Sequence, residues 1–273
     1  MMQRETWAIL LVLLLAGGVI FVHVTTTTEE YSRYNIGWNG TSDLAAEEVR
    51  DLRDLSRYPG ATLLILAPDQ PFTPEDVGYL RMFLDDGGHV LIADEEGTAN
   101  PFLEDLRSTM RVRPGNFVSL DRDRADPGLF VGHIVENAGL FTGVETILLN
   151  RPAAVEGGDP LFETSVMTWE DLDRDGRPGG RETFGTVVVC AHEGNLSVLG
   201  DSSLFINAML EENPKFIQDL QPLLIDGAHS RIGTRNSFIN TLVWARETPL
   251  AASTLAALAV LPVACWFGRR ENV

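Results

Sequence analysis

One stretch of the chain constrains its fold more than any other, because residues 61–95 follow the pattern strand, helix, strand. Ala61–Asp69 is a short apolar run that ends in a Pro-Asp turn, which is typical of a buried strand. Thr73 is then placed to cap a helix, and Gly87 is placed to end it. His89–Glu95 is a second apolar run. Because two strands that are joined through a helix usually run parallel in the same sheet, we expect the two runs to be adjacent and parallel.

Further elements are expected on both sides of this unit. We expect helices over residues 42–58, 101–108, 203–210 and 238–246, and strands over 145–150, 186–192 and 196–201. The loop-rich stretch 111–143 carries no pattern that assigns it to a strand or a helix. The alternation of strands and helices predicts an α/β fold in which helices cover both faces of a mostly parallel sheet.

Two uncharged apolar segments bracket this region. Trp7–Val24 and Pro249–Gly268 each have about the length needed to cross ~30 Å of hydrocarbon, so the sequence predicts two transmembrane helices. A cleaved signal peptide is the alternative for the first segment, and the lack of a small-x-small pattern after it favours an uncleaved anchor. Arg4 and Arg269 indicate that residues 1–6 and 269–273 are cytoplasmic tails. We therefore expect residues 25–248 to form an extracytoplasmic domain held at the cell membrane.

The charge of the chain limits its partners. The formal net charge is −18, and Lys215 is the only lysine. Nucleic acid needs a basic surface, so it is excluded as an expected partner. The expected partners are the lipid bilayer, through the two apolar segments, and proteins of a membrane complex.

The sequence offers no recognised catalytic motif. It contains no G-x-G-x-x-G, no G-x-x-x-x-G-K-[ST] and no G-x-S-x-G. Cys190 and His192 lie two residues apart on one face of an expected strand, but a reactive thiol needs a turn or a helix start. We therefore expect no catalytic residue, and a non-enzyme is favoured.

Polar side chains gather where strands are expected to end, and ligands bind at the carboxyl ends of strands in an open parallel sheet. A Gly-rich turn before residue 42 adds backbone amides that are suited to an anion. The candidate ligand-binding residues are Asn39, Gly40, Thr41, Asp94, Asp201, Ser202, Ser203 and Asn207. The alternative is that these residues only build turns and helix caps.

One motif has the spacing of a calcium loop. Residues 171–182 match D-x-D-x-D-G-x5-E, which supplies carboxylates for Ca²⁺. The expected metal ligands are Asp171, Asp173, Asp175, Glu182 and the backbone carbonyl of Arg177. A bound Ca²⁺ would be structural, and a solvated acidic loop is the alternative.

Four short segments carry a family resemblance: Tyr34–Ser42, Trp169–Glu182, Gly200–Asn207 and Leu224–His229. In these segments the chain resembles archaeal membrane proteins that carry the domain of unknown function 4350. The resemblance implies a flavodoxin-like fold of the class I glutamine-amidotransferase type. It also implies a link to MoxR-type ATPases through neighbouring genes. Amidotransfer itself is not implied, because residues 93–97 occupy the place of the amidotransferase nucleophile and contain no cysteine.

Three functions remain as hypotheses. The first is a non-catalytic, membrane-anchored extracytoplasmic domain that binds a ligand or a partner. The second is a metal-dependent hydrolase that uses Asp94, Glu95 and Asp201. The third is a structural domain that couples two membrane helices, and it predicts no pocket at the strand ends.

Overall fold

The computed structural model describes residues 11–19, 25–121, 125–135 and 141–235, together with residues 237 and 239. The chain divides into two compact units, and residues 28–234 form the unit that contains every described strand. The prediction of two flanking transmembrane helices is wrong for the described residues. None of the helices in this part of the chain is long and apolar enough to cross a membrane. Pro249–Gly268 and most of the helix expected over 238–246 lie outside the described residues.

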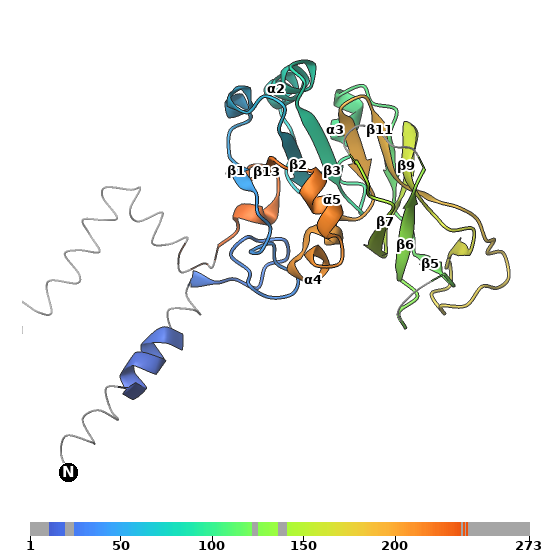
Figure 1. The fold of residues 1–273 in the computed structure, drawn as a ribbon, viewed down its shortest axis with the longest axis horizontal. Helices are drawn as coiled ribbons and strands as arrows, with labels where there is room; N and C mark the ends of the chain where they lie inside the picture. Colours follow the sequence, from blue (N-terminus) through green and yellow to red (C-terminus); the bar gives the residue numbers. More distant parts are fainter. Residues whose placement is uncertain are drawn as a thin grey trace, which may run out of the picture. The chain divides into compact units, whose positions relative to one another are not determined.

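A nine-stranded mixed sheet forms the centre of the domain (Figure 1). Its first five strands run parallel to one another. They are, in spatial order, β1 (Glu47–Val49), β13 (Leu223–Asp226), β2 (Thr62–Leu66), β3 (His89–Ala93) and β12 (Leu196–Leu199). The order then continues through antiparallel strands β11 (Val188–Glu193), β9 (Asp159–Thr164), β6 (Leu129–Ile134) and β7 (Thr146–Asn150).

The expected mostly parallel, flavodoxin-like sheet is therefore wrong. The physical reason is visible in the connections. Only Gly194 and Asn195 separate β11 from β12, and so short a turn can join only antiparallel strands. Gly194 supplies the left-handed backbone of this turn, with φ of 60°.

Two small antiparallel ribbons extend the domain. One pairs β5 (Phe117–Ser119) with β10 (Thr168–Glu170), and the other pairs β4 (Arg111–Arg113) with β8 (Ala154–Glu156). Strands β4, β5 and β6 fall in the stretch 111–143 that the sequence left unassigned.

The strand–helix–strand unit is confirmed. Helix α2 (Pro74–Asp85) connects β2 to β3, and these two strands are parallel neighbours. Thr73 and Asp76 form a capping box at the start of α2. Leu64 and Ile65 are both 0% exposed, because β2 is covered on both faces.

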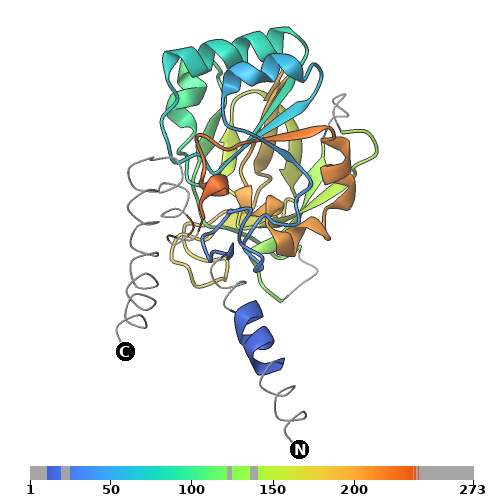
Figure 2. The same ribbon diagram turned by 90° about the vertical axis from the view of Figure 1, so that its left-hand side faces the viewer.

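Helices cover both faces of the sheet (Figure 2). On one face, the 3₁₀ helix η1 (Leu52–Arg57), α2 and α3 (Asn100–Asp105) pack over one hydrophobic cluster. On the other face, the short helices η2 (Ser202–Phe205), α4 (Asn207–Leu210) and α5 (Pro214–Asp219) pack over a second cluster. A last 3₁₀ turn, η3 (Arg231–Gly233), follows β13.

The helix expected over residues 42–58 is wrong. Residues 47–49 form the edge strand β1, and only residues 52–57 are helical. Pairing of β1 with β13 overrides the acidic, helix-like start of this segment. The helix expected over 203–210 is also divided, into η2 and α4.

Candidate functional site

A hollow opens at the carboxyl ends of β2 and β3, and we call it the strand-end hollow. Its volume is about 100 Å³, which exceeds the ~10–15 Å³ needed by a single water molecule. Ala67, at the end of β2, has φ of 42°, a conformation that residues with a Cβ rarely adopt. The hollow is lined by Glu30, Tyr31, Ala67, Pro68, Asp69, Asp94, Glu95, Glu96, Thr98 and Arg231.

Acidic groups dominate this lining. Five of the lining residues are Asp or Glu, and Arg231 is the one basic residue among them. Arg231 already pairs with Asp69, with Nε 2.9 Å from Oδ2. The pKa of Glu30 is raised by partial desolvation and then by the negative charge of Glu95, although Arg231 opposes the shift. The hollow therefore holds more negative charge than its own residues neutralise.

Glu95 connects the hollow to the buried start of η2. The Tyr31 hydroxyl donates to Glu95 Oε1 at 2.9 Å, and the Ser202 amide donates to Glu95 Oε2 at 2.9 Å. The Ser202 hydroxyl contacts both Glu95 and Tyr31. Burial, followed by the charge of Glu95, raises the pKa of the Tyr31 hydroxyl, so this hydroxyl stays protonated and acts as a donor.

Asp94 supports the backbone of the loop that follows β3. Oδ1 accepts from the amides of Glu96 and Gly97 and from the Thr98 hydroxyl. Oδ2 accepts from the Ala99 amide at 2.8 Å. Burial raises the pKa of Asp94, and these donors oppose the shift. Asp94 thus shapes the wall of the hollow, and its oxygens are already engaged.

Asp201 is buried and does not line the hollow. Oδ2 accepts from the Asn150 amide at 2.7 Å, and Oδ1 accepts from the Ser203 hydroxyl at 2.6 Å. The side chain is almost completely enclosed, with 1% exposure. Burial raises the pKa of Asp201 to about 7, against the hydrogen bonds from Ser203 and Asn150. Asp201 and Ser203 therefore join η2 to the edge strand β7.

A second hollow adjoins the first and shares Pro68, Asp69 and Thr98 with it. We call it the aromatic hollow, and its volume is about 340 Å³. The remaining lining residues combine apolar and polar side chains: Gln70, Pro71, Phe72, Pro101, Phe102 and Asp105. The two hollows are neighbours, because they share three residues, and we call them together the groove; residues 67–72 and 94–105 supply most of its lining.

The candidate residues of the Gly-rich turn are engaged within the protein. The Gly40 amide donates to Gly37, and a Cβ at Gly40 would lie 1.8 Å from the Asn35 carbonyl oxygen. The Thr41 hydroxyl donates to the Tyr31 carbonyl. Asn39 Oδ1 accepts from Asn35 Nδ2. The turn is thus held tightly to itself.

Asn207 fastens this turn to α4. Its side-chain nitrogen Nδ2 donates to the Gly37 carbonyl at 2.7 Å and to the Ser42 hydroxyl at 3.0 Å. Its Oδ1 accepts from the Asp43 amide at 3.0 Å. These contacts make Asn207 a latch between segments 164 to 170 residues apart in sequence.

The acidic loop brings three carboxylates together. One ligand atom each from Asp171, Asp173 and Asp175 lies within 4.8 Å of the others, which is compatible with a shared metal ion. The Asp175 amide donates to Asp173 and lowers its pKa, but desolvation and the neighbouring carboxylates raise it overall. Glu182 lies outside this group, and its oxygens accept from the amides of Leu172 and Gly179.

Arg177 donates its amide to Asp175 Oδ1 at 2.8 Å. Gly176 has φ of 70°, as the sharp turn of such a loop requires. Among the described residues, this is the only group of three acidic or metal-binding side chains with this spacing. Asp94, Glu95 and Asp201 therefore do not form such a group.

Several residues of the groove were not expected from the sequence. Glu30 and Arg231 lie far apart in the sequence, and only the fold brings them to the strand-end acid Asp69. The Pro-Asp turn after β2 was a usable signal for Asp69. Phe72 and Phe102 carried no signal beyond their apolar character.

Fold and site together define an α/β domain with a mixed sheet and an acidic groove at the carboxyl ends of two parallel strands. The chain belongs to the family described as "Domain of unknown function (DUF4350)", whose model matches residues 33–220. No curated protein matches the chain.

Two solved structures are similar to the chain. One is the "mmIFT52 N-terminal domain", with 18% identity, a TM-score of 0.43 and coverage of 62% of this chain and 77% of that chain. The other is an α-L-fucosidase isoenzyme 2 from Paenibacillus thiaminolyticus, with 13% identity, a TM-score of 0.31 and coverage of 62% and 25%.

Proposed function

We propose that this chain is a non-catalytic binding domain whose ligand enters the groove with a positively charged group. The observation that carries the proposal is the acidic strand-end hollow, where five carboxyl side chains face one arginine that is already paired. Carboxylates at close range repel one another, and a cation between them relieves that repulsion. Glu30 and Glu96 are exposed and are the groups that an entering cation would meet first.

The aromatic hollow narrows the class of ligand. It continues the strand-end hollow and offers the rings of Phe72 and Phe102 beside three prolines. The apolar chain of a ligand would be removed from water there, while the charged group of the same ligand lies among the carboxylates. The best fit is therefore an organic cation with an aliphatic arm, such as an alkylamine or the lysine side chain of a partner protein.

Calorimetry with hexylammonium tests this proposal. Hexylammonium should bind, while hexanoate, which has the same arm and the opposite charge, should not. The double variant Glu30→Gln/Glu96→Gln should lose most of the affinity. Glu145→Gln/Glu211→Gln removes the same charge from exposed positions outside the groove and should leave the affinity unchanged. Equal binding of the two probes, or equal losses in the two double variants, would contradict the proposal.

The proposal includes an extracytoplasmic location and a place in a membrane complex that is linked to a MoxR-type ATPase. The acidic composition and the resemblance to archaeal membrane proteins support it. Protease added to intact cells should cut the domain. Full protection, under conditions that digest a known surface protein, would contradict this location.

We also propose that the acidic loop binds a structural Ca²⁺. The clustering of Asp171, Asp173 and Asp175 favours this site. Because Glu182 now accepts from two loop amides, it would have to turn inward to complete the ligand shell. Asn116 Nδ2 lies 3.3 Å from Asp171 Oδ2, so an ordered loop would also fix the segment that leads into β5.

Thermal unfolding with added Ca²⁺ tests the loop. The wild-type domain should melt at a higher temperature in millimolar Ca²⁺, because an ion that binds only the folded state stabilises it. Asp173→Ala/Glu182→Ala should abolish the shift. Asp85→Ala/Glu104→Ala, which removes two exposed acids from α2 and α3, should retain it. An unchanged melting temperature in the wild type would exclude the site.

A metal-dependent hydrolase remains the alternative function. Its three carboxylates are not grouped around one point among the described residues, and those of Asp94 and Asp201 are saturated by donors. The groove itself argues against the purely structural alternative, which predicts no pocket at the strand ends.

A further inference from the structure

His229 lies in a stack of three rings beside the groove. The Phe72 ring is stacked on the His229 imidazole, with 3.9 Å between the centroids and 14° between the planes. The Phe102 ring is stacked on Phe72, also at 3.9 Å. His229 follows β13, Phe72 precedes α2, and Phe102 belongs to α3. The stack therefore joins three elements around the aromatic hollow.

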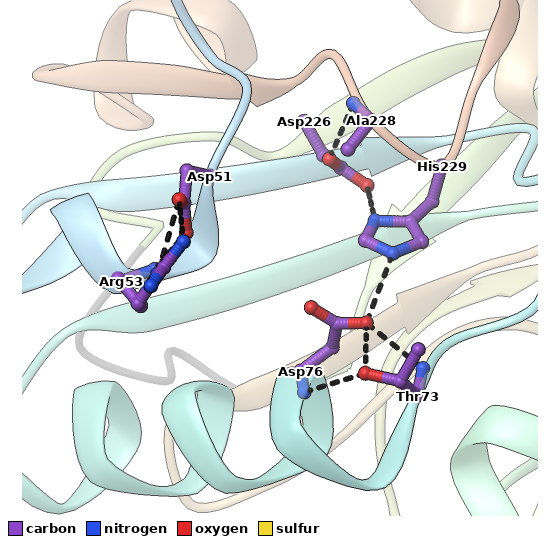
Figure 3. Close-up of polar contacts among 7 residues, drawn as sticks. All are labelled: Asp51, Arg53, Thr73, Asp76, Asp226, Ala228 and His229. Carbon is purple, nitrogen blue, oxygen red and sulfur yellow. Dashed lines mark hydrogen bonds and ion pairs between the residues drawn. The ribbon is translucent and has the colours of Figure 1, made fainter.

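Two carboxylates flank the imidazole (Figure 3). Nδ1 lies 2.9 Å from Asp226 Oδ2, at the end of β13, and Nε2 lies 3.4 Å from Asp76 Oδ2, in the first turn of α2. Asp226 is completely buried, and His229 is only 7% exposed. Asp76 also accepts from the Thr73 hydroxyl and amide. Each ring nitrogen thus faces a carboxylate oxygen that can accept a hydrogen bond from it.

The backbone of His229 holds the wall of the groove. Its carbonyl oxygen accepts from the amides of Asp69 and Gln70, at 2.9 and 3.3 Å. Arg231, two residues further on, pairs with the Asp69 carboxylate. Residues 67–72 line the two hollows. Any change that loosens His229 is therefore transmitted directly to the groove.

We propose that His229 is a pH-dependent clamp, which holds the loop of residues 67–73 against β13 and α2 when its ring is protonated and releases that loop when the ring is neutral. The clamp regulates the groove that we propose as the ligand site, and its control of ligand affinity rests on that proposal.

Only the imidazolium ion satisfies both carboxylates. With a proton on each nitrogen, His229 donates to Asp226 and to Asp76 at once. A neutral ring that donates to Asp226 turns the lone pair of Nε2 toward the Asp76 carboxylate. That arrangement loses one charge-assisted contact and adds a repulsion. The neutral ring thus loses its contact with α2, and the segment that carries the His229 carbonyl is held less firmly against the loop of residues 67–73.

The expected direction of the pH effect follows from the pKa of His229. Burial lowers this pKa, but the hydrogen bond and charge of Asp226, together with Asp76, outweigh burial and raise it above 6.5. The clamp is then complete below the pKa of the unfolded chain and is lost as the pH rises through the higher folded pKa. Opening is therefore expected on the alkaline side of pH 6.5.

Other charged groups lie on the elements around the ring. The Asp69–Arg231 pair lies on the loop beside the carbonyl of His229, and the Asp51–Arg53 pair lies at the start of η1 (Figure 3). Each of these acids is already paired with an arginine. Asp105, on α3, lines the aromatic hollow. Asp226 and Asp76 are the charges that act on His229 itself.

Amide hydrogen exchange without ligand tests the clamp. In the wild type, the protection of the Asp69 and Gln70 amides, corrected for intrinsic exchange, should fall as the pH rises above 6.5. The fall should be about tenfold for each pH unit by which the closed-state pKa of His229 exceeds the open-state pKa. In His229→Gln the protection should not vary with pH, and in His133→Gln, an exposed histidine of β6, it should vary as in the wild type.

A second variant keeps the test decisive if His229→Gln does not fold. Asp76→Asn removes one charge and should move the transition to lower pH, and an unchanged transition would overturn the proposal. Equal pH dependence in the wild type and in His229→Gln would also overturn it. Because this experiment needs no ligand, it can fail while hexylammonium binding succeeds, or succeed while that binding fails.

Discussion

Replacing Asp201 with asparagine should stabilise the domain at neutral and alkaline pH. Asp201 is 1% exposed, and its folded-state pKa is raised to about 7 from 3.8. The folded state therefore binds more protons than the unfolded state between pH 3.8 and about 7. The free energy of unfolding falls as the pH rises through this window, and the full cost of the buried charge is present above it.

The size of the effect follows from the same values. One pKa unit corresponds to about 1.4 kcal/mol, so the shift from 3.8 to about 7 amounts to on the order of 4 kcal/mol. Asparagine has the shape of the protonated acid. Its oxygen can accept from the Asn150 amide and its nitrogen can donate to the Ser203 hydroxyl, so both partners stay satisfied.

Urea unfolding of both proteins from pH 4 to pH 8 measures this difference. The difference in free energy of unfolding, Asp201→Asn minus wild type, should be near zero at pH 4. It should grow to several kcal/mol in favour of the variant by pH 8. A difference that stays constant with pH, or a variant that is less stable at pH 8, would refute the reasoning about Asp201.

Two further substitutions separate fold from ligand binding. Leu64→Asp places an unpaired charge at a position that is 0% exposed, and circular dichroism should show loss of the folded domain, whereas Met82→Asp, at an exposed position of α2, should stay folded. Asn207→Ala removes the latch to residues 37–43 and should lower the free energy of unfolding by about 2–3 kcal/mol, since each such bond contributes about 0.5–1.5 kcal/mol. If Asn207 served only a ligand, its replacement would leave urea unfolding unchanged.

Local signals in the sequence predicted part of the fold well. The apolar run of β2 and the Thr73 cap of α2 depend on contacts within a few residues, and both are confirmed. The strands β7, β11 and β12 were also expected close to their observed positions. Each of these segments is buried enough for its hydrophobic pattern to identify it.

These local patterns could not predict the direction of the strands or which strands pair. The strands expected over 186–192 and 196–201 left room only for a short turn at Gly194, but the consequence of that turn for the whole sheet depended on which strands lie beyond it. Strand β1 forms because Glu47–Val49 meet β13, a contact across more than 170 residues. No local propensity of an acidic tripeptide predicts such a pairing.

The candidate site also contains some residues that the sequence predicted and others that it did not. Asp94 and Asp201 were singled out as strand-end acids, and both lie at the ends of their strands, although their oxygens hold the backbone and neighbouring side chains. The groove also needs Glu30, Phe72 and Arg231, which come from three separate segments of the chain. Only the tertiary structure could reveal that combination.

A cation that enters the groove at the carboxyl ends of β2 and β3 should change the environment of the amides around it. Amide chemical-shift mapping of the folded domain during titration with hexylammonium, with hexanoate as the comparison, measures this change. We expect saturable shifts with hexylammonium that are confined to residues 67–73 and 94–105, together with Glu30 and Arg231, and no shifts with hexanoate. Shifts centred on residues 171–182 instead, or the same shifts with both probes, would contradict binding of a cation in the groove.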